Sequence, residues 1–373
     1  MQISNSNVLI TGGAGLVGSH LADALLARGC RVKLLDSLEP YTHPHGAPEW
    51  IPQEAKFISG NLRDKHTLEE ALRDVDFVFH QAAFTGFDPE STRYLDANTL
   101  GTAEIFDVIA EQHFPIRKIV VASSLSIYGE GKYQCQSHGV SYPDMRPLAQ
   151  LKRHQWQPKC NVCGEALNWL PTDEASPTLP FTPYAVSKYA AELLALALGK
   201  RLEIPTVALR YAVAYGSRQS IFNAYSTVIT TFATLLANDR PPVLYEDGQQ
   251  CRDWTYVEDI VRANLFAMED ERTNYQSFNV GTGVPGSVRL VAELLAKSLG
   301  RSIAPVTHEQ FRPGDIRNLV LDVSKLRALG FEPRVTLEEG ISRFVTWFQS
   351  LGKVQQYYSA LEERMRTSGE LLS

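Results

Sequence analysis

Short apolar runs alternate with amphipathic segments along the first half of the chain. The runs NVLI, RVKLLD, KFIS, DFVFH and RKIVVAS are separated by helical patterns at residues 16–28, 67–73 and 91–111. This order predicts parallel strands joined by helical crossovers. The segments VLI, VKLL, FVF and IVVA are continuously apolar, as expected for strands buried on both faces. We therefore predict an α/β fold built on a doubly wound parallel sheet.

The pattern breaks at residues 130–178, where Pro, Gln, His, Trp and Cys dominate and no period persists, so we interpret this segment as an insertion. Beyond it, TVALR, PVLY and SFNV have strand patterns. These elements predict further sheet strands and a smaller C-terminal lobe over the carboxyl edge of the sheet, where doubly wound folds bind ligands. Helical patterns follow the insertion at about 184–203, 224–237, 257–269 and 288–299, and the charged tail after 352 is predicted to be helical.

Composition narrows the class of protein. The 373 residues are 44% hydrophobic and 21% charged, as in an ordinary globular protein of one large unit or two lobes. A net charge of −6 argues against nonspecific binding to nucleic acid. The N-terminus lacks a secretory signal, and no run approaches the ~18 apolar residues of a membrane span. We expect a cytoplasmic protein with neither nucleic acid nor a membrane as its partner.

A glycine-rich turn follows the first apolar run. In TGGAGLVGSHLADALLARG, Gly12, Gly15 and Gly18 precede an apolar helix. Such glycines permit a tight turn and a close approach of backbone to a pyrophosphate, which then faces the helix N-terminus. Asp36 ends the second predicted strand, where its carboxylate can accept hydrogen bonds from a ribose and repel a 2′-phosphate. Together these features predict a dinucleotide site that favours NAD over NADP.

Six ordered motifs carry a resemblance to a known family: TGGAGLVGSHL, GNLRD, HQAA, NTLGT, SSLSIYG and YAVSK. The chain resembles the extended short-chain dehydrogenases along nearly its whole length. We accordingly expect an NAD-binding Rossmann domain over 1–129 and 179–210, a mainly substrate-binding lobe over 211–352 with segments returning to the sheet, and a helical tail over 353–373. The insertion, 130–178, is expected to bind zinc through the cysteines and histidine described below. It also implies a homodimer, because relatives often dimerise through a four-helix contact. The residues expected at the dinucleotide are Gly12, Gly15, Leu16, Val17, Asp36, Asn61, Leu62, Ala82, Ala83, Tyr184 and Lys188.

Three residues form the predicted catalytic group. Tyr184 and Lys188 are four positions apart at the start of a predicted helix and therefore share one face. A tyrosine with its ordinary pKa of about 10 is a poor base at neutral pH, and a nearby ammonium lowers that pKa by favouring the phenolate. Tyr184 would exchange a proton with the sugar, Lys188 could also hold the nicotinamide ribose, and Ser124 would hydrogen-bond the reacting oxygen.

The segment SSLSIYG also excludes one reaction. In sugar-nucleotide 4,6-dehydratases this turn carries an adjacent acidic pair that moves protons between C5 and C6. Here those positions are Leu125 and Ser126. Elimination of water lacks its acid and base, and oxidation and reduction at one carbon remain.

The second half contains LRYAVAYGSRQS, EDGQQCRDWTYVEDI, FNVGTG and FRPGDIRN. The resemblance places Arg218, Arg252 and Arg312 at the substrate's diphosphate, where planar guanidinium groups suit bidentate contacts. Thr85 and Ser126 are further candidates for substrate contact. Relatives commonly have Asn where this chain has Val213, so the substrate must be seated differently there.

The insertion carries four candidate metal ligands. Cys135 and His138 form CxxH, and Cys160 and Cys163 form CxxC, with 21 residues between the two knuckles. This spacing is typical of a tetrahedral structural zinc site. All four ligand positions are filled, which argues against catalytic zinc. A redox pair or unrelated cysteines is the alternative.

The combined motifs resemble nucleotide-sugar 4-epimerases. We predict 4-epimerisation through a transient 4-keto sugar, with a dTDP-L-rhamnose-like 6-deoxysugar as the favoured substrate. One alternative is a 4-ketoreductase or dehydrogenase with net redox change and free cofactor exchange. Another is a non-catalytic dinucleotide-binding sensor or scaffold, against which Ser124, Tyr184 and Lys188 argue.

Overall fold

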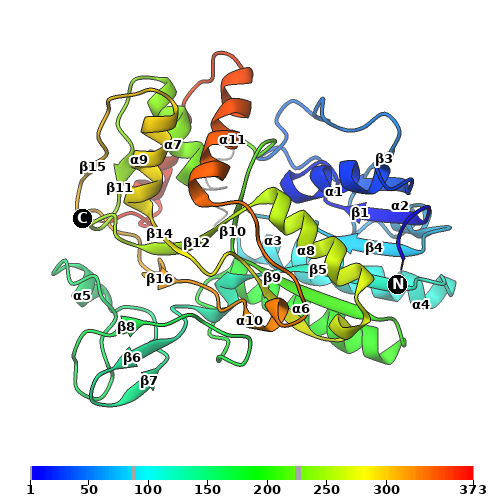
Figure 1. Ribbon diagram of the computed structural model, residues 1–373, viewed down its shortest axis with the longest axis horizontal. Coiled ribbons are helices and arrows are strands. Elements are labelled where there is room, and N and C mark those ends of the chain that lie inside the picture. The colour runs from blue at the N-terminus through cyan, green and yellow to red at the C-terminus, as the bar shows by residue number, and fades with distance from the viewer. Residues whose placement is uncertain (1, 86–89, 223–227, 373) are drawn as a thin grey trace.

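A seven-stranded parallel sheet forms the centre of the larger part of the molecule (Figure 1). The computed structural model describes residues 2–85, 90–222 and 228–372. The strand order is β3-β2-β1-β4-β5-β9-β13, and all neighbouring pairs are parallel. The chain winds outward from β1 to β3 and then crosses back to β4, so the strand order reverses between β1 and β4. This confirms the predicted doubly wound sheet, with strands β1 (Asn7–Thr11), β2 (Arg31–Asp36), β3 (Lys56–Ser59), β4 (Phe77–His80), β5 (Lys118–Ser124), β9 (Thr206–Tyr211) and β13 (Ser277–Val280).

Both faces of this sheet are covered, which explains the continuous apolar runs. Val8 and Ile10 of β1 belong to one buried apolar cluster, whereas Leu9 between them belongs to another. Successive side chains of a strand point to opposite faces, so each layer of helices buries alternate residues. The helices that contact the sheet or each other around it are α1 (Leu16–Leu26), α2 (Lys65–Leu72), α4 (Gly101–Gln112), α6 (Pro183–Arg201) and α8 (Val257–Glu269).

One predicted helix has a more complex form. The segment expected as a single helix at 91–111 consists of α3 (Ser91–Tyr94), the π-helical turn η1 (Leu95–Leu100) and α4. Such turns occur frequently at functional sites. A short 3₁₀ turn, η2 (Leu125–Tyr128), also follows β5 directly.

The C-terminal lobe contains a separate mixed sheet of β10 (Val213–Tyr215), β12 (Cys251–Tyr256), β14 (Pro285–Ser287) and β16 (Asn318–Leu319). A two-stranded sheet joins β11 (Val243–Leu244) to β15 (Val306–Thr307). Residues 224–227 of one expected helix lie outside the described residues, and the remainder is α7. The other elements of this half are α7 (Val228–Ala237), η3 (Glu271–Thr273), α9 (Val288–Ser298), α10 (Ser324–Arg327), α11 (Leu337–Ser350) and the tail helix α12 (Tyr358–Thr367).

The insertion lies beside the C-terminal lobe, at the lower left of Figure 1. Its strands β6 (Tyr133–Cys135), β7 (Gly139–Ser141) and β8 (Asn168–Trp169) form a small antiparallel sheet, and α5 (Leu148–Leu151) follows β7. Strands this short produce no detectable hydrophobic period, which is why the sequence predicted none. A small cluster of Tyr133, Cys135, Cys160 and Leu167 forms the core of this segment.

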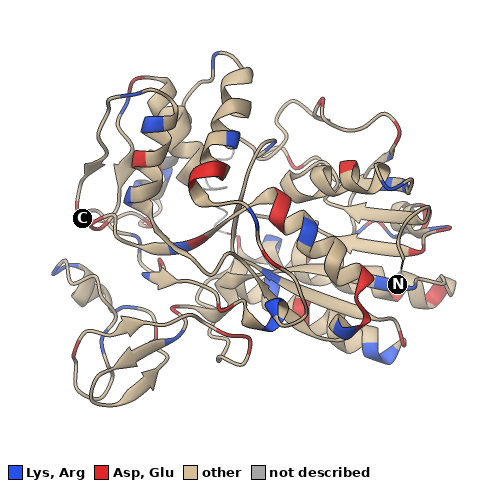
Figure 2. Cartoon of the chain, viewed as in Figure 1, with Lys and Arg blue, Asp and Glu red and all other residues tan. Residues whose placement is uncertain are grey.

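Charges of both signs are distributed along the chain. Figure 2 shows Lys and Arg interspersed with Asp and Glu, in keeping with the modest net charge of −6. Among the helices in the described part of the chain, none has both the length and the apolar character needed to cross a bilayer.

Candidate active site

The glycine turn after β1 is too crowded for side chains. Gly12 has a φ of +68°, and a Cβ placed on it would lie 2.7 Å from the amide nitrogen of Ala82. A Cβ on Gly18 would lie 2.1 Å from the carbonyl oxygen of Gly12. Glycine at these positions therefore lets the turn pack against the segment after β4 and lets α1 pack against the turn. Gly15 is the N-cap of α1, so the first amides of this helix face the crevice above the sheet.

Asp36 is positioned by two backbone amides at the end of β2. Its Oδ2 accepts a hydrogen bond of 3.0 Å from Ala14 N, and its Oδ1 accepts one of 2.9 Å from Leu38 N. The carboxylate is thereby held beside the glycine turn. Ser37 follows it, so no Arg or Lys stands at the adjoining position to balance this negative charge.

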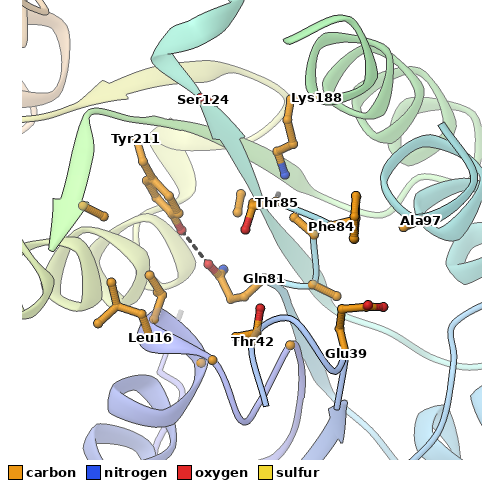
Figure 3. Close-up of a pocket in the computed structure, with 18 of the residues that line it drawn as sticks. Leu16, Glu39, Thr42, Gln81, Phe84, Thr85, Ala97, Ser124, Lys188 and Tyr211 are labelled. Atoms are coloured by element: carbon orange, nitrogen blue, oxygen red, sulfur yellow. Dashed lines mark hydrogen bonds between the residues drawn. The ribbon is translucent and has the colours of Figure 1, made fainter. Parts of the chain in front are cut away.

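A cavity of about 560 Å³ opens above the carboxyl ends of β1, β2, β4 and β5 (Figure 3). Every residue that the sequence assigned to the dinucleotide lines it, as do Ser124, Thr85 and Ser126. The sequence reasoning did not single out other residues of its wall, including Glu39, Thr42, His43, Gln81 and Tyr211. Gln81 lies within the HQAA motif and Tyr211 within LRY, so the motifs contained a signal for both. The Tyr211 hydroxyl donates a hydrogen bond of 2.9 Å to Gln81 Oε1.

Helix α6 presents Tyr184 and Lys188 to this cavity. The helix begins at Pro183, and the side chain of its N-cap, Thr182, accepts a hydrogen bond of 3.1 Å from Ala185 N. Burial lowers the pKa of Lys188 to about 8, while the carboxylate of Glu192 acts in the opposite direction. The lysine is therefore a desolvated cation close to neutral pH, which is a strong source of positive potential for a neighbouring tyrosine.

Ser124 ends β5 and also lines the cavity. Its Oγ accepts hydrogen bonds from Ser126 Oγ at 2.9 Å and from Ser126 N at 3.2 Å. With both contacts accepted, the Ser124 hydroxyl proton can be directed at a bound molecule.

Asn98 of the π-helical turn connects two parts of the cavity wall. It accepts a hydrogen bond of 2.6 Å from Phe84 N and donates to Phe84 O at 3.2 Å and to Ser187 Oγ at 2.9 Å. Asn98 is 1% exposed. It therefore ties the segment after β4 to the helix that carries Tyr184 and Lys188.

Comparison with known proteins identifies the family. The model described as NAD dependent epimerase/dehydratase family matches residues 8–155, and the model described as GDP-mannose 4,6 dehydratase matches residues 162–344. A putative UDP-glucose 4-epimerase of Methanocaldococcus jannaschii is 31% identical over 92% of this chain and 98% of its own length. The chain belongs to the NAD-dependent epimerase/dehydratase family.

Relatives in this family bind the expected molecules. A dTDP-L-rhamnose 4-epimerase of Burkholderia thailandensis is 29% identical over 92% of this chain and 95% of its own. The crystal structure of Thermotoga maritima UDP-glucose 4-epimerase with UDP-glucose superposes with a TM-score of 0.77, at 28% identity over 93% and 100% of the two chains. That of Thermus thermophilus UDP-glucose 4-epimerase with NAD gives 0.73, at 30% identity over the same shares. This family member is an enzyme with NAD-dependent nucleotide-sugar epimerase/dehydratase activity.

The three arginines expected at the substrate's diphosphate are not among the described residues that line the cavity. Arg218 has a φ of 63° and forms an ion pair of 2.7 Å with Asp23 of α1. Arg252 of β12 donates to the carbonyl oxygen of Arg317 at 3.2 Å. Arg312 lies between β15 and β16. Their contact with a diphosphate stays a prediction.

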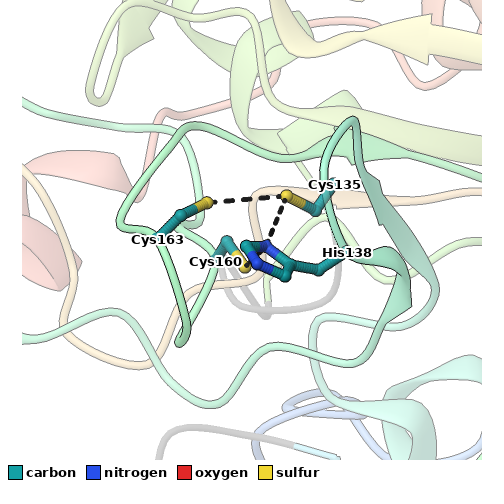
Figure 4. A group of neighbouring side chains, drawn as sticks. All are labelled: Cys135, His138, Cys160 and Cys163. Atoms are coloured by element: carbon teal, nitrogen blue, oxygen red, sulfur yellow. Dashed lines mark hydrogen bonds between the residues drawn. The ribbon is translucent and has the colours of Figure 1, made fainter.

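The four candidate metal ligands of this epimerase/dehydratase come together in the insertion (Figure 4). Their ligand atoms all lie within 4.8 Å of one another. Cys135 Sγ lies 3.5 Å from His138 Nδ1 and 3.6 Å from Cys163 Sγ, and Cys160 Sγ lies 3.6 Å from the same Nδ1. A tetrahedral zinc site with Zn–N bonds of about 2.0 Å and Zn–S bonds of about 2.3 Å separates its N and S ligand atoms by about 3.5–3.8 Å. The donor set and its spacing therefore fit a tetrahedral metal ion.

Proposed function

We propose that the protein is a nucleotide-sugar 4-epimerase that retains NAD through each turnover. The observation that carries this proposal is the presence of Ser124, Tyr184 and Lys188 on the same cavity as the glycine turn. The match to a model named for a dehydratase covers residues 162–344, which do not include positions 125 and 126. Leu125 and Ser126 offer no carboxyl group for the elimination of water. Redox chemistry at a single carbon is the reaction that the remaining groups support.

The cavity fits NAD. The glycine turn, which carries no side chains, lets a pyrophosphate approach its backbone, the N-terminal amides of α1 offer donors, and Asp36 offers an acceptor for a ribose. Bound NAD would accept a hydride from the sugar and return it. We propose NAD rather than NADP because the Asp36 carboxylate, followed by Ser37, would repel a 2′-phosphate. Denaturing the purified protein and identifying the released dinucleotide tests this choice, and mainly NADP would contradict it.

The residues of the site would divide the proton chemistry among themselves. The buried ammonium of Lys188 stabilises Tyr184 as a phenolate, and this phenolate accepts the proton of the sugar's C4 hydroxyl to become a neutral tyrosine. Ser124 donates a hydrogen bond to the same oxygen, because its own acceptor capacity is used by Ser126. After the 4-keto sugar presents its other face, Tyr184 returns the proton to the reduced oxygen.

We propose a dTDP-6-deoxysugar of the L-rhamnose type as substrate. Its support is the 29% identical dTDP-L-rhamnose 4-epimerase together with Val213, which lines the cavity. An apolar side chain there cannot hydrogen-bond a sugar hydroxyl, whereas a methyl group at C6 needs no partner.

A panel of nucleotide sugars tests the reaction and the substrate together. Purified protein is incubated with dTDP-L-rhamnose, UDP-glucose or UDP-glucuronate without added cofactor, and the configuration at C4 is followed by NMR. Inversion at C4 is expected, fastest for dTDP-L-rhamnose. Turnover only with added NADH or NAD would indicate a reductase or dehydrogenase, and no turnover would favour the sensor or scaffold.

We also propose that the insertion binds structural zinc and that the protein forms a homodimer. The Cys3His set fits structural zinc because no ligand position is left for water. Leu95 and Leu100, with Val186 and Leu193 of α6, are 40–51% exposed, which supports dimerisation through these helices. Metal analysis and light scattering test these two statements, and a metal-free protein or a monomer at micromolar concentration would contradict them.

A further inference from the structure

Buried charges join the insertion to the C-terminal lobe. Arg146 precedes α5, and its guanidinium lies between two carboxylates: Nε is 3.2 Å from Glu130 Oε1, and Nη2 is 2.8 Å from Glu246 Oε1. Arg317 also contacts Glu246, at 3.0 Å. Glu130, Glu246 and Arg317 are each 1% exposed, and Arg146 is 5% exposed. Ion pairs removed from water in this way are sensitive to geometry, because each charge depends on its partner.

The same groups also hold the backbone of residues 312–317. Arg146 Nη2 donates to Asp315 O at 2.6 Å, and Glu130 Oε2 accepts a hydrogen bond of 2.9 Å from Arg317 N. From the lobe side, Arg252 Nη1 donates to Arg317 O at 3.2 Å. The segment is therefore held between the insertion and β12, and it contains one of the arginines expected at the diphosphate, Arg312.

Two of the metal ligands lie close in sequence to residues that hydrogen-bond to this buried charge network. Tyr133 lies two residues before Cys135 on β6, and its hydroxyl donates a hydrogen bond of 3.2 Å to Glu130 Oε2. Arg146 also donates to Trp156 O at 2.9 Å, four residues before Cys160. Hydrogen bonds therefore connect the strand that carries Cys135, and the segment that precedes Cys160, to Asp315 and Arg317.

We propose that Arg146 is a positioning residue for the substrate's nucleotide diphosphate: it fixes residues 312–317 and so couples the metal-binding insertion to substrate affinity. This inference rests on the proposed nucleotide-sugar substrate. Substituting Arg146 would therefore change KM and nucleotide affinity, whereas substituting Ser124, Tyr184 or Lys188 would change kcat.

The test compares Arg146→Lys with Arg153→Lys. The first variant keeps the buried charge but offers a single donor nitrogen in place of the two, Nη1 and Nη2, through which Arg146 donates hydrogen bonds. Arg153 is an exposed arginine of the same insertion and receives the same substitution as a control. Affinity for UDP and dTDP is measured by calorimetry on the NAD-loaded protein, with NAD and metal content determined for each sample.

For Arg146→Lys we expect the dissociation constant for the nucleotide to rise about tenfold, which corresponds to about 1.4 kcal/mol. We also expect kcat, NAD content and metal content to be retained, and faster hydrogen exchange at residues 312–317. Tyr133→Phe removes only the hydroxyl that contacts Glu130 and should also weaken nucleotide binding. It provides a second test in case Arg146→Lys does not fold.

Unchanged nucleotide affinity in both variants would overturn the inference. Loss of NAD in parallel with the nucleotide would also overturn it, because that pattern indicates general damage, and so would an equal effect of Arg153→Lys. A wild-type protein that binds neither UDP nor dTDP overturns it as well. Calorimetry needs no turnover, so a protein that binds nucleotide without inverting C4 refutes the proposed epimerisation and leaves this inference standing.

Discussion

Replacing Lys188 by methionine should stabilise the cofactor-free protein while disabling the site. Lys188 is 4% exposed, and burial lowers the pKa of its ammonium from 10.5 to about 8. At 1.36 kcal/mol per pKa unit, the folded protein disfavours the charged form by about 3 kcal/mol. Methionine has a similar length and no charge, so the variant should recover much of this free energy of unfolding at pH 7. Lys188, which we propose acts in catalysis, would then be retained at a cost in stability.

The stability gained by Lys188→Met should depend on pH. Because the folded pKa lies below the unfolded one, the folded protein binds fewer protons than the unfolded chain between pH 8 and 10.5. Through this group the stability of the wild type rises across that window. The advantage of Lys188→Met is therefore complete below pH 8 and disappears by pH 10.5.

Urea unfolding of the cofactor-free proteins at pH 7 and pH 9.5 measures the effect. Lys200→Met, at the exposed end of the same helix, is the matched control and should change stability little. A Lys188→Met protein no more stable than the wild type at pH 7 would refute the reasoning. So would an advantage of equal size at both pH values.

Three further predictions follow from the site. Tyr184→Phe should retain NAD and lower kcat by about 10²–10⁴-fold, measured with the nucleotide sugar that the wild type turns over; near wild-type turnover would show that Tyr184 is not the base. Gly18→Ala should strip NAD from the purified protein, because its Cβ would lie 2.1 Å from Gly12 O, and full NAD occupancy would contradict that steric argument. Cys160→Ser should lose the metal and weaken UDP and dTDP binding but keep NAD, with Cys251→Ser as control; a metal-free wild type, or loss of NAD with the metal, would count against this separation.

The Rossmann half of the fold was largely predictable. Its strands are buried on both faces, so each appears as an uninterrupted apolar run, and the helices between them are long enough to show a period. The C-terminal lobe was less predictable from the sequence. Its strands β10, β14 and β16 have two or three residues, and α11 (Leu337–Ser350) was not predicted at all. The insertion's sheet was also missed, because strands of two or three residues are stabilised by their partners and not by a pattern of their own.

The candidate site was predictable where its residues form contiguous motifs. Gly12, Gly15 and Gly18 mark a turn whose conformation depends on neighbours a few residues away. Gln81 and Tyr211 escaped notice, although both lie in quoted motifs, because their hydrogen bond joins positions 130 residues apart. For Arg218 and Arg252 the sequence indicated the residues but not their contacts, because a motif shows that a cation is present and not which group it contacts.

The sequence by itself therefore determined the local geometry: the glycine turn, the shared helix face of Tyr184 and Lys188, and the paired knuckles of the insertion. These features depend on chain conformation over a few residues. Only the tertiary structure decided that burial brings the pKa of Lys188 to about 8, and that Arg146 lies between two carboxylates from different parts of the chain. Desolvation and ion pairing depend on which distant segments surround a group, and a linear sequence does not specify those neighbours until the chain has folded.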